Sequence, residues 1–112
     1  MDDALLVRKV SKYRLTSAIA EKRIKRIAAA SNSIKWSLHG LHRMEEREIF
    51  DVDVLRILRD GMISGEPEET PIGGEWKCKM VRKLRGTREA GVVVIILRKD
   101  CLLIKTVEWE DL

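Results

Sequence analysis

The spacing of apolar residues changes from a helical period to a strand period about two thirds of the way along the chain. Residues 2–31 contain no glycine or proline and are rich in the helix formers Ala, Leu, Lys and Arg. A repeating spacing of four and three positions places one set of residues on a single helical face: Leu6, Val10, Tyr13, Ser17, Ala20, Ile24 and Ile27. The pattern predicts one long amphipathic helix that packs either on the core of its own domain or on a partner.

A short break of small and polar residues, 28–33, follows this helix and predicts a hinge. We therefore expect an N-terminal basic arm over residues 1–32 and a compact domain over residues 33–112. Within that domain, Ser37 is a good N-cap for a helix over 38–48 whose apolar side carries Leu41 and Met44. Ile49 and Phe50 then anchor the turn to the next helix.

A third helix is expected to begin at Asp51 or Asp53, with three side chains facing inward: Val54, Leu55 and Leu58. Gly61 stands where a left-handed C-terminal cap belongs. The acidic, proline-rich and glycine-rich stretch 66–74 predicts a loop.

From residue 76 onwards the apolar residues alternate with polar ones, as in a half-buried strand. Trp76, Cys78 and Met80 share one face of this strand, and the opposite face is basic. Residues 86–91 predict a turn, 91–98 a central strand covered on both sides, and 101–109 a last strand; residues 62–63 add an edge strand. In the last strand Leu102, Ile104, Thr106 and Glu108 should share one face. This order predicts an α+β fold, with N-terminal helices followed by a small antiparallel sheet of three to four strands.

Composition narrows the class of protein without identifying a partner. The 112 residues carry 22 Lys and Arg against 18 Asp and Glu, and no apolar run approaches the roughly 20 residues of a membrane span. The two cysteines, Cys78 and Cys101, are too few for a disulfide framework, so we expect free thiols in a reducing cytoplasm. The net charge of +4 is unevenly distributed. Residues 1–35 carry nine basic and three acidic side chains, residues 36–71 carry four and nine, and residues 72–112 carry nine and six.

His39, Arg43 and Arg47 recur every four residues and therefore share one face of the second helix. A histidine can move a proton near neutral pH and arginines bind phosphate oxygens, so this face suits a phosphodiester. The alternative is an exposed stripe in which Arg43 pairs with Glu46 or Glu48. Thr106 and Glu108 would complete the site if their face of the last strand lies toward His39.

A second basic group lies on the first long strand and the turn after it: Lys77, Lys79, Arg82, Lys83, Arg85 and Arg88. Beside Trp76, such a row suits a nucleic-acid backbone with a stacked base, and it equally suits an edge strand protected by charge. A zinc site built from His39, His42, Cys78 and Cys101 is a weaker alternative, because these residues have no recognised ligand spacing. We expect no metal and no cofactor.

The segment 36–49, with the letters WSLHGLHRMEEREI, resembles the DUF4258 family of domains of unknown function, and the resemblance extends to residues 105–107. The resemblance implies a fold related to RelE-like and barnase-like ribonucleases. It further implies an endoribonuclease toxin of a toxin–antitoxin module that needs no metal, with RNA, including ribosome-bound mRNA, and a cognate antitoxin as partners. By position it implies catalytic roles for His39, Arg43, Arg47 and Thr106. A module of the same fold that binds RNA or protein without catalysis is the alternative, and the N-terminal helix adds the expectation of a homodimer.

Overall fold

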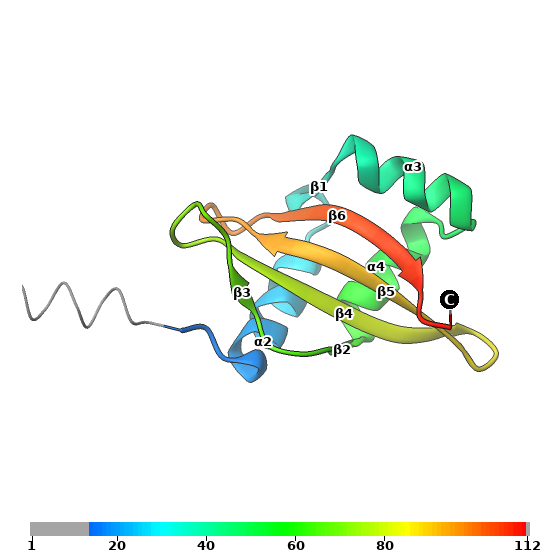
Figure 1. The fold of residues 1–112 in the computed structure, drawn as a ribbon, viewed down its shortest axis with the longest axis horizontal. Coiled ribbons are helices and arrows are strands. Elements are labelled where there is room, and N and C mark those ends of the chain that lie inside the picture. Colours follow the sequence, from blue (N-terminus) through cyan, green and yellow to red (C-terminus); the bar gives the residue numbers. More distant parts are fainter. Residues whose placement is uncertain (1–13, 112) are drawn as a thin grey trace, which may run out of the picture.

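The computed structural model of this protein describes residues 14–111 (Figure 1). Helix α2 spans Ser17–Ala28, a 3-10 turn η1 spans Ser31–Ser33, and helices α3 and α4 span Leu38–Arg47 and Asp51–Asp60. The strands are β1 (Ile34–Trp36), β2 (Met62–Ile63), β3 (Glu68–Glu69), β4 (Trp76–Arg85), β5 (Arg88–Ile96) and β6 (Leu102–Trp109). The α+β class is confirmed.

The sheet has six strands rather than the three to four expected. Their order is β1-β6-β5-β4-β2, and β3 also pairs with β4. The short strands β1 and β3 were missed, because two or three residues show no measurable alternation. The β1–β6 pair is parallel, while every other pair among the described strands is antiparallel, so the expectation of a purely antiparallel sheet was wrong.

Helix α2 is shorter than the helix that the sequence predicts. Arg14 and Leu15 are not helical, and Thr16 caps the helix by accepting a hydrogen bond from the Ile19 backbone N–H at 3.3 Å. The predicted part over residues 2–13 lies outside the described residues. Ala20 and Ile24 are fully buried in the core that α2 shares with the sheet. The part of the apolar face that the structure describes therefore packs on the core of its own domain. This core includes residues on both sides of residue 32, where the sequence predicts the boundary between arm and domain.

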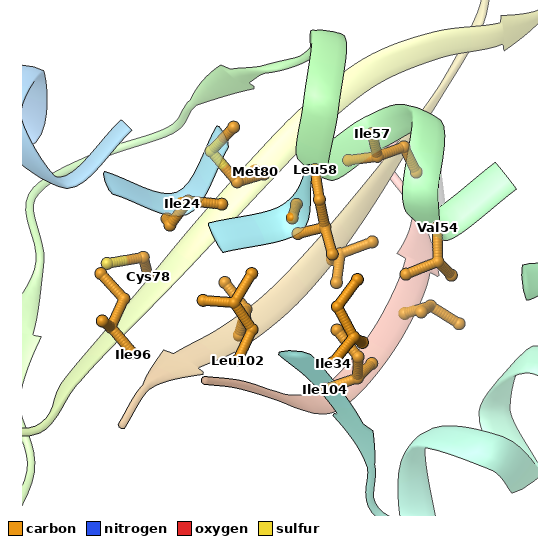
Figure 2. Close-up of a cluster of buried hydrophobic side chains, with 14 of the residues drawn as sticks. Ile24, Ile34, Val54, Ile57, Leu58, Cys78, Met80, Ile96, Leu102 and Ile104 are labelled. Carbon is orange, nitrogen blue, oxygen red and sulfur yellow. The ribbon is translucent and has the colours of Figure 1, made fainter. Parts of the chain in front are cut away.

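Helices α2 and α4 cover one face of the sheet, and the hydrophobic core lies between these helices and the strands (Figure 2). Ile24 of α2 and Leu58 of α4 point toward the strands in this view. Buried side chains of three central strands meet them: Trp76, Cys78, Met80, Val92, Val94, Ile96, Leu102, Ile104, Val107 and Trp109. On the opposite face Val93 and Ile95 are partly exposed, so the expectation of a central strand covered on both sides was wrong.

A bulge in β6 changes which of its residues share a face. Thr106 pairs with Val93, whereas Ile104 pairs with the next residue, Val94, so Lys105 is the extra residue. Val107 and Trp109 therefore join Leu102 and Ile104 on the buried face. Thr106 and Glu108 lie on the opposite face, which corrects the strict alternation that the sequence predicts.

The ends of the helices follow their predicted caps only in part. The Ser37 hydroxyl accepts a hydrogen bond from the Gly40 N–H at 2.9 Å, as expected for an N-cap. In α4 the N-cap residue is Phe50, and the Asp53 carboxylate accepts its N–H at 2.9 Å, so neither Asp51 nor Asp53 is the cap itself. Ile57 was missed as a core residue of α4, while Leu41 of α3 is 45% exposed.

The left-handed residue of this region is Glu48, with φ 53°, and not Gly61, which is extended at φ −82°. Gly61 is required for space, because a Cβ atom there would lie 2.6 Å from the Val81 carbonyl oxygen. The turn predicted at 86–91 is confined to Gly86 and Thr87, because β5 begins at Arg88. None of the described helices combines the length and apolar character that crossing a bilayer requires.

Candidate functional site

The uncovered face of the sheet carries most of the charged side chains of its central strands. Successive strand residues face opposite sides, and Cys78 and Met80 face the core, so Lys77 and Lys79 project from the uncovered face. Lys79 pairs across the sheet with Val93, which pairs in turn with Thr106. We call this uncovered side the open face.

Lys79 is held by two carboxylates on the open face. Its Nζ lies 2.8 Å from Glu110 Oε1 and 3.7 Å from Glu108 Oε1. Gly91 lies beneath this contact, and a Cβ atom there would lie 2.7 Å from both Lys79 Cε and Glu110 Oε2. The absence of a side chain at Gly91 therefore gives the lysine and the glutamate room to meet.

The carboxylates keep the Lys79 amine charged. Burial lowers the pKa of Lys79, but hydrogen bonds and charge attraction from Glu110 and Glu108 outweigh it, so the pKa is raised above its usual 10.5. Glu110 Oε2 is a buried oxygen without a hydrogen-bond partner in the described part of the chain. The cluster thus holds a fixed cation against a carboxylate of which one oxygen is buried without a hydrogen-bond partner within residues 14–111.

Helix α3 is fixed along the edge of β6 beyond the end of β1. The Ser37 N–H donates to the Ile104 carbonyl at 3.2 Å, and the Ser37 hydroxyl donates to the Lys105 carbonyl at 3.3 Å. At the other end of the helix, Arg47 Nη1 donates to the Val107 carbonyl at 2.6 Å. Arg47 was predicted as a catalytic group, but its guanidinium is committed to this edge of the sheet.

His39 and Arg43 lie together on the flank of α3 that faces away from α4. Arg43 Nε donates to His39 Nε2 at 3.4 Å, and Arg43 Nη1 is 3.0 Å from Glu46 Oε1, the ion pair expected in the alternative. On the other flank of α3, Leu41 lines a groove that extends to the start of α4. Since α4 covers the core face of the sheet, the periodicity of the helix turns His39 toward the side of the open face.

The second basic group does not form one row. Lys77 and Lys83 lie on the open face, and Lys77 Nζ is 3.4 Å from Glu68 Oε1. Arg82 pairs with Ala90, which is buried on the core side, and its guanidinium donates to the Lys83 carbonyl. Lys79 is therefore the basic residue that joins the Glu108 and Glu110 cluster.

Arg85 has different contact partners from the lysines of this group. Its guanidinium lies 5.4 Å from the ring centres of both Phe50 and Trp109, donates to the Glu48 carbonyl, and forms an ion pair with Asp53. Trp76 is 95% buried, so the expectation that it stacks a base was wrong.

The cysteines and histidines do not meet. Cys78 is buried in the core, where burial, partly offset by the charge of Arg23, raises the pKa of its thiol to about 11. His39 and His42 are exposed on α3. No group of three or more His, Cys, Asp or Glu side chains within residues 14–111 is arranged to hold a metal ion, so the zinc alternative is not supported there.

Sequence reasoning named Thr106, Glu108 and Lys79 but missed Glu110 and Gly91. The acidic alternation of Glu108 and Glu110 after Thr106 was a usable signal, because residues two apart share a strand face. Gly91 could not be found in this way, because its role depends on strand pairing across β4, β5 and β6.

Comparison with known proteins yields one match. The family model described as "Domain of unknown function (DUF4258)" matches residues 36–109, well over half of the chain and all of the site described above except Glu110. No curated protein and no solved structure matches.

Proposed function

We propose that this chain, which belongs to the family described as "Domain of unknown function (DUF4258)", is a cytoplasmic endoribonuclease that cleaves RNA without a metal ion. In this proposal it is the toxin of a toxin–antitoxin module, and a cognate antitoxin protein inhibits it. The supporting residues are its own side chains, since the description of the family assigns no activity.

The observation that carries the proposal is the position of Lys79. Its ammonium group lies over Gly91 and contacts two carboxylates. Lys79 is two strand pairings away from Thr106, through Val93, on the side of the sheet toward which His39 turns. In this proposal a phosphate on the open face uses Lys79 as the cation, Thr106 as the hydroxyl donor and His39 as the imidazole.

These groups match the needs of RNA transphosphorylation. The 2′-hydroxyl attacks the adjacent phosphorus, the bond to the 5′-oxygen breaks, and a proton moves from the first oxygen to the second. We assign proton transfer to His39, binding of the phosphate oxygens to Arg43 and Lys79, and orientation of the phosphate to Thr106. Arg47 keeps α3 in place through the Val107 carbonyl and acts as a positioning residue.

A non-catalytic module that binds RNA or protein remains the second candidate, because several cations near the site already have acidic partners. Arg43 pairs with Glu46, Lys77 with Glu68, and Lys79 with Glu110. Such pairs reduce the attraction of the surface for a polyanion, and the phosphate would have to displace them.

Incubation of the full chain with end-labelled single-stranded RNA in excess chelator tests the first candidate. We expect fragments ending in a 2′,3′-cyclic phosphate, and a loss of at least a hundredfold in cleavage rate for His39→Asn and Lys79→Met. Lys77→Met is the matched control, because it removes a lysine from the same strand and face, and it should keep most of the activity. Intact RNA with the unmodified chain, over a range of substrates including translating ribosomes, would favour the binding module.

Expression of the chain in bacteria tests the toxin assignment separately. Growth should stop, and co-expression of the product of the neighbouring gene should restore it. RNA cleavage without growth arrest would keep the nuclease and remove the toxin assignment.

A further inference from the structure

Exposed apolar side chains gather at the junction of α3 and α4, on the opposite flank of α3 from His39. A groove of about 430 Å³ there is lined by Leu41, Met44, Ile49 and Phe50 together with acidic side chains. Val52, at the start of α4, is 62% exposed. Three of the seven exposed large hydrophobic side chains within residues 14–111 thus lie at this junction: Leu41, Phe50 and Val52.

The edge of the groove is acidic. Glu45, Glu48 and Asp51 line it. None of these three carboxylates takes part in an ion pair within the part of the chain that the structure describes. An apolar floor with unpaired carboxylates at its edge fits an amphipathic helix that carries basic side chains.

A segment of that chemistry stands at the start of this chain. Leu6, Val10 and Tyr13 recur at helical spacing, and Lys9 and Lys12 flank them. A helix over residues 5–13 would be about 14 Å long, close to the roughly 15 Å of the ten-residue α3. Residues 1–13 lie outside the described part of the chain, and the helical face to which they belong is interrupted at Arg14 and Leu15.

We propose that the groove between α3 and α4 binds residues 1–13 of a second copy of this chain. In Figure 1 the start of α2 lies at one end of the molecule and the turn between α3 and α4 at the other, which favours exchange between copies over binding within one. A mutual exchange places two equivalent segments in two equivalent grooves, as twofold symmetry requires.

The mass of the full chain in solution, measured by sedimentation at micromolar concentrations, tests this proposal. We expect twice the 12.9 kDa of one chain. Leu41→Glu and Val10→Glu, from the two sides of the contact, should each weaken the dimer at least tenfold. Met62→Glu is the matched control, because Met62 is 67% exposed on β2 away from the groove, and it should leave the mass unchanged.

Charge reversal tests the pairing of the two surfaces directly. Lys9→Glu with Lys12→Glu should weaken the dimer, and so should Glu45→Lys with Glu48→Lys, whereas a mixture of the two proteins should form a heterodimer. A synthetic peptide of residues 1–13 should compete with dimer formation, and a scrambled peptide should not. A monomer at all concentrations, or a dimer that is insensitive to both charge reversals and to Leu41→Glu, would overturn the proposal. Circular dichroism establishes that each variant is folded.

Discussion

Arg47, the last residue of α3, and Trp109, the last residue of β6, are joined by a hydrogen bond. The Trp109 indole N–H donates to the Arg47 carbonyl at 2.9 Å, while the Arg47 guanidinium donates to the carbonyl of Val107, two residues before Trp109. These bonds fasten the C-terminal end of α3 to the sheet, and Ser37 fastens the other end. The flank that carries His39 and Arg43 is thereby held in one orientation.

Replacement of Arg47 should therefore reduce stability as well as activity. Arg47→Met retains much of the apolar stem but leaves the Val107 carbonyl without its donor, at a cost of about 1–3 kcal/mol in the free energy of unfolding. Arg43→Met is the control, because Arg43 pairs only with surface groups, and it should change stability by less than about 1 kcal/mol. Urea unfolding of both variants measures the difference. Equal stability of the two would show that Arg47 does not fasten the helix.

Close backbone approach explains why Gly61 tolerates no side chain. A Cβ atom there would meet the carbonyl oxygens of both Ile57 and Val81, so Gly61→Ala should destabilise by about 1–3 kcal/mol. Gly73 is the control, because nothing lies within 4 Å of a Cβ atom built there. Gly73→Ala should leave the thermal midpoint unchanged or raise it slightly, because it restricts the unfolded chain. A neutral Gly61→Ala in thermal unfolding would contradict the packing described here.

Helix α2 should prove essential to the core rather than detachable. Ile24 is fully buried and Ile19 is 53% exposed on the same helix, so the two isoleucines form a matched pair. Ile24→Ala should cost about 2–5 kcal/mol of unfolding free energy, whereas Ile19→Ala should cost far less. Chemical denaturation measures both. If both substitutions proved equally mild, α2 would be an independent arm after all.

The buried thiol of Cys78 predicts a loss of stability at alkaline pH. Burial raises its pKa from 9.0 to about 11, so the unfolded chain loses this proton at a lower pH than the folded chain. The contribution is fully present below pH 9 and is lost as the pH rises from about 9 to about 11. Unfolding free energies at pH 8 and pH 10.5 should therefore differ more in the unmodified chain than in Cys78→Ala.

The pKa of Lys79 is also raised, but this lysine is present in both proteins, so the comparison with Cys78→Ala isolates the thiol. Equal pH dependence in the two proteins would remove Cys78 as its source. As an independent check, a thiol reagent at pH 8 should modify the partly exposed Cys101 well before Cys78.

Glu108 and Glu110 both lie close to the Lys79 amine, and one substitution tests the contribution of Glu110 to its pKa. Glu110→Gln should leave Lys79 with a weaker partner and lower the pKa of its amine toward the usual 10.5, because the opposing charge is lost. Titration of the lysine amines by nuclear magnetic resonance measures this shift. Glu68→Gln, whose partner is Lys77, is the control and should leave Lys79 unchanged.

The sequence by itself determined the local elements, because helix period, strand alternation and caps are properties of neighbouring residues. It predicted that α3 begins directly after Ser37 and that Trp76, Cys78 and Met80 lie on one strand, β4. It also contains the segment that carries the family resemblance. The sequence did not show the contacts that distant segments decide: Arg47 donates to the Val107 carbonyl, and Arg85 contacts Phe50, Trp109 and Asp53.

Only the tertiary structure decided which side chains meet on the open face. The bulge at Lys105 turns Thr106 and Glu108 outward, and Gly91 on the neighbouring strand opens the space in which Lys79 reaches Glu110. Each of these facts depends on the register between strands, which follows from how the whole core packs. Register is a long-range property, so no window of neighbouring residues contains it.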